Sequence, residues 1–181
     1  MSALRLFLVV LLIVGSRGQA PSQTPAHHSG GSTPPPAQLK PFADILAGTW
    51  KLTWLDTAGQ VIGGGGESWK VEPGGVLVEE NRSTVNGRPS DDYAAMWWDS
   101  KAQTVHGIWC DREINDEGCS GFDAVVTKGE VVLTGSWEQQ GKRIFWRETF
   151  ERKDAQLTQA LFIGETAETT KLAGTIRGRR Q

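Results

Sequence analysis

The feature that most constrains this chain is a period-two alternation of apolar and polar residues, interrupted at short intervals by turn signals. Trp50, Leu52 and Trp54 alternate with threonine and lysine, which is the pattern of a strand with one buried face. Similar short runs continue to Arg177, separated by turns such as the Asn-Gly pair at Asn86. No long segment of helical period competes with them. The sequence therefore predicts an all-β fold of about nine or ten strands.

Sequential hairpins without an evident crossover favour an antiparallel up-and-down β-barrel. Closing the sheet removes its exposed edges, and a barrel of roughly eight or more strands can enclose a cavity. The chain has 8 Trp and 22 Gly, residues that suit strands and tight turns better than helices. The large indole rings can either fill the barrel or wall a pocket for a ligand, and composition alone leaves both interpretations open.

The N-terminal residues have the parts of an export signal. A short positive start precedes an apolar run from Leu6 to Val14, which is too short to span a bilayer, and small residues follow up to Ala20. We predict a signal peptide over 1–20 and hence a periplasmic or secreted mature protein without a membrane span. Residues 21–40 are rich in Pro, Ser and Gly and predict a disordered spacer. The barrel domain is then expected over 41–181.

Charge and motif content exclude several function classes. A formal net charge of −2 provides no basic surface for phosphate, so no nucleic-acid partner is expected. The sequence contains no nucleophile elbow, zinc-protease motif or phosphate loop. His27 and His28 lack further metal ligands, and Cys110, Cys119 and His106 are too few for a metal site. We therefore predict no cofactor and no metal; the oligomeric state does not follow from the sequence.

Cys110 and Cys119 flank an acidic loop. In an exported chain this arrangement favours one disulfide over two free thiols. Closing so short a loop contributes on the order of 2–3 kcal/mol to stability.

A short turn at Leu46 runs into Gly-x-Trp, with the tryptophan at Trp50. This signature resembles the opening of the first strand in lipocalins and their calycin relatives. The resemblance implies that Trp50 closes one end of an up-and-down barrel and packs against a basic side chain from a late strand. Arg177 is the candidate for that cation, since a guanidinium stacks favourably on an indole. The wider layout, from Gly-Gly before Val76 to a Gly-Thr-Ile-Arg ending, is similar to a family of exported bacterial domains of unknown function, number 1579.

Two glutamates fall on predicted apolar faces. By parity Glu67 lies on the same face as Trp69, and Glu148 lies on the same face as Trp146. An ionised carboxylate removed from water must find a partner or shift its pKa. One interpretation is that both glutamates line a wet cavity and hold the polar end of a ligand, together with His106.

The alternative is that each glutamate lies at a barrel mouth or pairs with Arg143, Arg147 or Arg152 in a structural network. His106 itself falls on a less apolar face, because Val105 and Trp109 take the opposite one.

Three functions follow from these features. The first is binding of a small apolar or amphipathic molecule, with a ligand site formed by Trp54, Glu67, Trp69, Trp97, His106, Trp146 and Glu148. The second is a structural or interaction protein of the cell envelope whose barrel is filled by its own side chains. The third is an enzyme that uses Glu67 and Glu148 as acid and base. Cavity volume separates the first function from the second.

Overall fold

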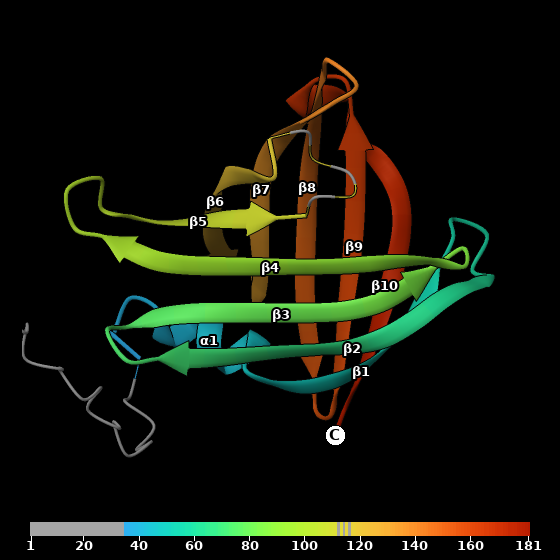
Figure 1. Cartoon of the computed structure of the whole chain (residues 1–181). Helices are drawn as coiled ribbons and strands as arrows, with labels where there is room; N and C mark the ends of the chain where they lie inside the picture. Colours follow the sequence, from blue (N-terminus) through green and yellow to red (C-terminus); the bar gives the residue numbers. More distant parts are fainter. Residues whose placement is uncertain (1–34, 112, 114, 116) are drawn as a thin grey trace, which may run out of the picture. The chain divides into compact units, whose positions relative to one another are not determined.

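The computed structural model describes residues 35–181 except 112, 114 and 116, so the predicted signal peptide and most of the predicted spacer lie outside the described residues. One short helix, α1 (Lys40–Leu46), precedes ten strands, and a 3-10 turn, η1 (Ala167–Thr169), separates the last two. The strands are β1 (Gly48–Leu55), β2 (Val61–Glu72), β3 (Val76–Val85), β4 (Arg88–Asp99), β5 (Thr104–Cys110), β6 (Cys119–Thr127), β7 (Glu130–Gln139), β8 (Lys142–Lys153), β9 (Gln156–Gly164) and β10 (Lys171–Arg180) (Figure 1).

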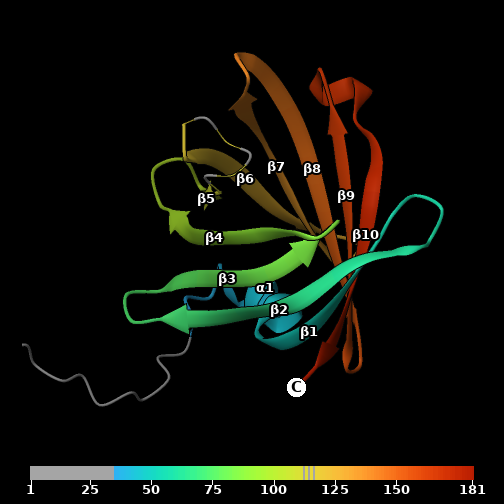
Figure 2. The same ribbon diagram turned by 45° about the vertical axis from the view of Figure 1, so that its right-hand side comes forward.

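The strands form one closed antiparallel barrel (Figure 2). Each strand pairs with its neighbours in sequence, and β1 also pairs with β10, from Trp50 opposite Arg180 to Leu55 opposite Thr175. This arrangement confirms the predicted all-β up-and-down barrel. No helix in the described part of the chain is long and apolar enough to cross a membrane.

The turns explain why the sequence predicts this topology. Asn86, Lys128 and Gln140 each have a positive φ and each precede a glycine that also has a positive φ. Two such residues in succession form the tight turn whose twist matches that of the flanking strands. At the β5–β6 connection, Cys110 lies opposite Cys119 with their sulfur atoms 2.13 Å apart, as predicted.

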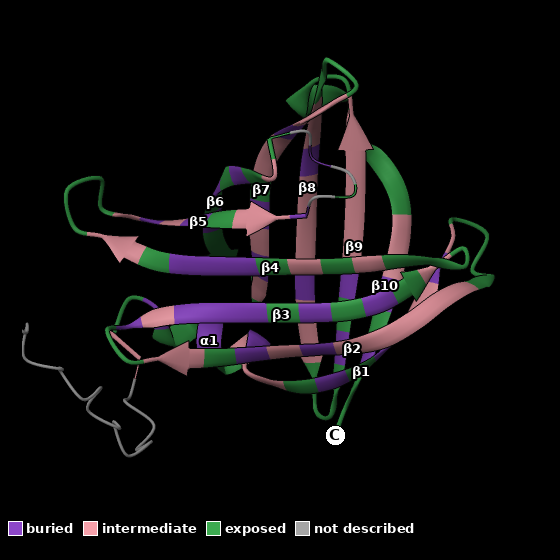
Figure 3. Ribbon diagram, viewed as in Figure 1, coloured by how far each residue is buried: buried purple, intermediate pink, exposed green. Residues whose placement is uncertain are grey.

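Burial alternates along the strands and defines the inner face of the barrel (Figure 3). Along β3, for example, Asn81 and Ser83 are buried whereas Arg82 and Thr84 are exposed. Polar residues therefore point inward on this strand, although the rest of the core is mainly aromatic and aliphatic.

Helix α1 packs its apolar side chains into the core at the end of the barrel where β1 begins and β8 ends. Leu39, Phe42 and Leu46 are all buried, and the Nε1 atom of the fully buried Trp50 donates a 2.9 Å hydrogen bond to the Leu46 carbonyl. Leu39 was expected in the spacer, so the folded unit starts slightly earlier than residue 41. Trp50 thus fastens the helix to the first strand.

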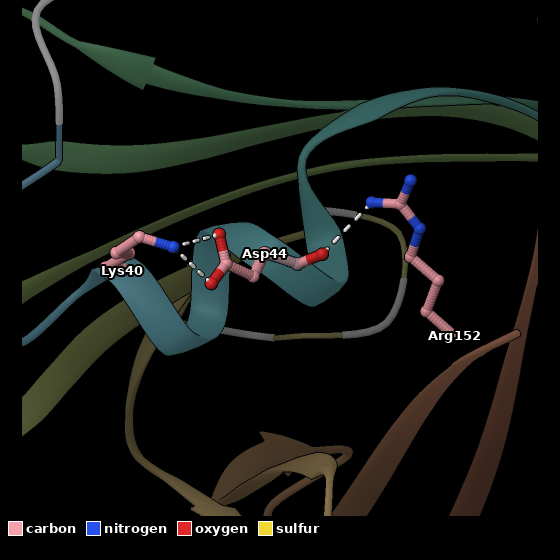
Figure 4. Close-up of polar contacts among 3 residues, drawn as sticks. All are labelled: Lys40, Asp44 and Arg152. Carbon is pink, nitrogen blue, oxygen red and sulfur yellow. Dashed lines mark hydrogen bonds and ion pairs between the residues drawn. The ribbon is translucent and has the colours of Figure 1, made fainter. Parts of the chain in front are cut away.

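The cation beside Trp50 is Arg152, not Arg177. The Arg152 guanidinium carbon lies 5.5 Å from the centre of the Trp50 ring, and its Nη1 atom donates a 3.0 Å hydrogen bond to the Asp44 carbonyl (Figure 4). The prediction for Arg177 is wrong because Ile176 points inward, which turns the neighbouring Arg177 to the exposed outer face. A basic residue at the end of β8 therefore ties α1 to the barrel.

Replacing Arg152 by alanine removes both the stacking on Trp50 and the hydrogen bond to α1. We expect the free energy of unfolding to fall by about 1–2 kcal/mol. The matched variant Arg177→Ala removes an exposed cation from β10 and is expected to change stability by less than about 0.5 kcal/mol. Urea unfolding followed by tryptophan fluorescence measures both values, and equal losses in the two variants would contradict the assignment.

Candidate functional site

The barrel encloses a cavity of about 380 Å³. Its deeper wall includes Leu52 and Phe150, whereas Val85, Pro89 and Glu113 line it near the turns at the end opposite α1. Because α1 and Trp50 close the other end, the mouth lies among these turns. The interior is therefore not filled by its own side chains, which contradicts the filled-barrel alternative.

Aromatic rings form much of the wall. Trp109 lies 5.6 Å from Trp137 and 6.2 Å from Trp146, measured between ring centres, and Phe122 lies 5.9 Å from Trp146. The Trp146 indole covers Gly135, where a Cβ atom would come within 2.9 Å of it. The glycine thus provides the space in which this ring lies flat against β7. The tryptophans wall the cavity and leave room beside them.

Four carboxyl groups from four strands line the same cavity: Glu67 on β2, Glu79 on β3, Asp92 on β4 and Glu148 on β8. Their side chains share the inward face with the aromatic rings. Burying acidic groups together is costly unless they are hydrogen-bonded or protonated. The hydrogen bonds of each group show which of the four carboxyl groups have partners within the protein.

Glu67 is held in place by its neighbours. Its carboxylate oxygens accept hydrogen bonds from the Trp69 Nε1 atom and from the Gln159 Nε2 atom across the barrel. The pKa of Glu67 is raised to about 7, mainly by burial. The two hydrogen bonds lower this pKa and the nearby Asp92 charge raises it, but both effects are smaller than that of burial. Glu67 is a fixed part of the cavity wall.

Glu79 and Asp92 belong to a chain of hydrogen bonds across three strands. Trp54 donates from Nε1 to the Ser83 hydroxyl at 3.3 Å, Ser83 donates to the Asn81 Oδ1 atom at 2.7 Å, and Asn81 donates from Nδ2 to Asp92 at 2.8 Å. Strand β2 lies between β1 and β3, and it has Gly63 opposite Trp54 and Gly65 opposite Ser83. Because these glycines have no side chain, they do not block the hydrogen bond from Trp54 to Ser83. Glu79 completes the chain by hydrogen bonding to Asp92.

Both carboxyl groups of this pair resist ionisation. Burial, followed by the charges of Asp92 and Glu67, raises the pKa of Glu79 well above its usual value of 4.5. Burial also raises the pKa of Asp92 to about 6, although hydrogen bonds from Asn81 and Glu79 favour its ionised form. The hydrogen bond between them raises the pKa of Glu79 and lowers that of Asp92, so Glu79 is the donor in this bond.

Glu148 faces the cavity differently. No hydrogen bond or ion pair of its carboxyl group occurs among the described residues, and burial, then the charges of Glu67 and Asp92, raises its pKa well above 4.5. The predicted pairing with arginine is wrong. Arg143 pairs with Glu138 at 2.9 Å and Arg147 stacks on Phe162, both on the outer face of β8. Arg152 lies instead at the closed end of the barrel, where it contacts α1 and Trp50.

Three further polar atoms of the interior have no hydrogen-bond partner in the described part of the protein. They are the Nε1 atoms of Trp137 and Trp146 and the Oε2 atom of Glu79. Each residue is at most 6% exposed and lines the cavity. Buried polar atoms are nearly always hydrogen-bonded, so three atoms without a partner in the wall of the cavity are unusual. Each of the three atoms is itself inaccessible to solvent, so a polar group in the cavity reaches them only when a side chain shifts.

Two predicted ligand-binding residues lie elsewhere. His106 is on the outer face of β5, where its Nδ1 atom is 2.6 Å from Asp123, and Trp97 is 37% exposed beside it. Both border a separate depression on the outside of the barrel. The reason is strand parity: Met96 is fully buried, so Trp97 must point outward, and Val105 directs His106 outward in the same way.

The structure brings the other five predicted residues together around the cavity: Trp54, Glu67, Trp69, Trp146 and Glu148. Sequence reasoning missed a second set, Glu79, Asn81, Asp92, Trp109, Trp137 and Gln159. Glu79 and Asn81 had no signal in the sequence, because Val76, Leu77 and Val78 are all apolar and show no alternation that fixes the inward face. No group of three His, Cys, Asp or Glu among the residues described is arranged to hold a metal ion.

Comparisons with known proteins support the fold alone. No family model matches the chain, and no match is found among curated proteins. Among solved structures, the chain is similar to the crystal structure of Rv2717c from M. tuberculosis, with a TM-score of 0.56 and 10% sequence identity over 82% of this chain and 99% of that one. The chain therefore shares a barrel fold with Rv2717c, consistent with a lipocalin-like barrel, while similarity to family 1579 stays a prediction.

The buried carboxyl groups predict that stability falls as pH rises. In the unfolded chain Asp and Glu side chains lose their protons near pH 3.8 and pH 4.5, whereas folded Asp92 and Glu67 keep theirs up to about 6 and 7. Between about pH 5 and about pH 8 the folded state therefore binds more protons, and each pKa unit costs up to about 1.4 kcal/mol of unfolding free energy. Urea unfolding at the two pH values measures the decrease.

Glu148→Gln removes one such group without removing a hydrogen bond. We expect this variant to match the wild type near pH 5 and to be more stable than it at about pH 8, by on the order of 1 kcal/mol. The control Glu151→Gln changes an outward residue of the same strand that pairs with Lys153 and is expected to keep the wild-type slope. If the free energy of unfolding of Glu148→Gln fell with pH as steeply as that of the wild type, the burial of this charge would be disproved.

Proposed function

We propose that this chain is an exported binding protein that holds a small amphipathic molecule inside its barrel. The observation that carries the proposal is the combination of an aromatic cavity with the Glu148 carboxyl group, which lines it and has no hydrogen-bond or ion-pair partner among the described residues. The aromatic wall accommodates an apolar body, and the Glu148 carboxyl group accommodates a polar end. Export rests on the N-terminal sequence pattern, and the bonded Cys110 and Cys119 are compatible with it.

The dimensions of the site support this function. Ligand sites are typically concave, mostly apolar pockets of roughly 300–1,000 Å³ with a few placed polar groups. A cavity of about 380 Å³ lies in this range. Helix α1 and Trp50 close one end of the cavity, so a ligand enters through the opposite end.

The neutral dye N-phenylnaphthylamine tests the proposal directly, because its fluorescence rises in apolar surroundings. We expect one dye molecule to bind per chain and to quench part of the tryptophan emission. Native mass spectrometry of protein purified from its own host provides a second measurement, in which a retained small molecule adds to the protein mass. Absence of saturable dye binding would refute cavity binding.

A matched pair of variants locates the bound dye. Leu161 lines the cavity on β9, whereas Thr158 on the same strand is exposed on the outside. Leu161→Trp places bulk inside the cavity and is expected to weaken dye binding by about tenfold or more, equivalent to about 1.4 kcal/mol. Thr158→Trp adds the same side chain outside and is expected to leave dye affinity unchanged. Equal affinities in both variants would place the dye outside the barrel.

A further inference from the structure

The polar groups of the cavity differ from those that suit an anionic ligand. In the described part of the chain, the charged side chains that line it are Glu67, Glu79, Asp92, Asp111, Glu113 and Glu148, with Arg88 as the one cation. Arg88 is exposed and belongs to the turn region at the mouth. A carboxylate or phosphate entering the barrel would therefore meet groups of its own charge sign, without a buried cation to offset them.

The same groups suit a positive charge. Glu148 has no partner for its carboxyl group among the described residues, and the Oε2 atom of the 4% exposed Glu79 is unpaired. Both are acceptors for an N–H donor. The indole rings of Trp109, Trp137 and Trp146 line the same cavity, and the faces of such rings attract cations.

From this arrangement we propose that the polar end of the ligand is a cation, and that the cavity selects organic ammonium compounds over neutral or anionic molecules of the same shape. The inference rests on the proposed binding function and adds the charge of the ligand to it. The carboxyl groups of Glu79 and Glu148 accept hydrogen bonds from the ammonium group, and the indoles surround the adjoining carbon atoms.

Binding of a cation is coupled to proton release. The charged groups that line the cavity come from β2 (Glu67), β3 (Glu79), β4 (Asp92), β8 (Glu148) and, near the mouth, from Arg88, Asp111 and Glu113. Strands β1, β5, β6, β7 and β9 contribute neutral side chains to the lining. Burial raises the pKa of Glu67 to about 7 and that of Asp92 to about 6, and it raises the pKa values of Glu79 and Glu148 as well. A bound ammonium ion favours the ionised forms of these groups. Affinity for a cation therefore rises between about pH 5 and about pH 8, and affinity for a carboxylate falls.

Three compounds with one chain and different heads test the inference: octylamine, octanol and octanoate, each measured by displacement of N-phenylnaphthylamine. Octylamine stays protonated over the whole range because an alkylammonium group titrates near the lysine value of about 10.4. At about pH 8 we expect octylamine to bind about tenfold or more tightly than octanol, and octanoate to bind most weakly. The preference of octylamine over octanol is expected to shrink at about pH 5.

Variants separate charge from shape. Glu148→Gln keeps the size of the side chain and is expected to lower octylamine affinity about tenfold, while octanol affinity stays within a factor of about two. Glu151→Gln, which removes the same charge from the outer face of β8, is expected to change neither affinity. Glu79→Gln gives a second, independent test inside the cavity, with the same expected result as Glu148→Gln.

The outcomes distinguish the two proposals. Displacement of the dye with octanol equal to octylamine, or with octanoate strongest, overturns the cation preference and leaves the binding function intact. An unchanged octylamine affinity in both Glu148→Gln and Glu79→Gln also overturns it. Failure of the dye and of all three compounds to bind overturns the binding function itself and the inference that rests on it.

Discussion

The structure depends on one constraint, the pairing of β1 with β10, which closes the sheet on itself. Closure leaves no strand edge unpaired, and it also forces alternate residues of every strand into one interior. Because the interior of a barrel with ten strands is wide, large rings are needed along its wall, and even these leave a cavity. Trp50 then closes one end, held by Leu46 and covered by Arg152. The closed sheet, the size of its aromatic rings and the closure of one end by Trp50 together produce a cavity with a single mouth.

Period-two alternation was sufficient to predict the barrel and the inward direction of Trp54, Glu67 and Glu148. It did not predict the direction of side chains where the local sequence lacks a regular alternation of apolar and polar residues. Leu77, Val78 and Glu79 are all buried, so their run shows no alternation from which Glu79 could be placed. Asp92 lies at the end of the polar run from Arg88 to Asp92, in which no apolar residue marks the inward face of β4. The hydrogen bonds that join these residues cross three strands, and such pairing depends on register rather than on local pattern.

The two misplaced ligand residues and the misplaced cation have different causes. Trp97 and Trp98 are adjacent, so parity places one of them outside without saying which; buried Met96 decides it. For Arg177, the alternation itself pointed outward beside Ile176, and only the family resemblance placed it against Trp50. The true partner, Arg152, is close in space because β8 ends where α1 begins, a neighbourhood set by barrel topology.

The carboxyl groups in the cavity weaken the fold rather than support it. Leucine or methionine at Glu148 would bury apolar surface without the cost of holding an acid away from water, as replacements of buried charges often show. Glu67 has two hydrogen-bond partners and thus a structural role, but Glu148 has none among the described residues. Side chains that cost stability, face a cavity and have raised pKa values are typical of functional sites. This energetic argument makes the charge of the cavity, more than its size, the property that determines what it binds.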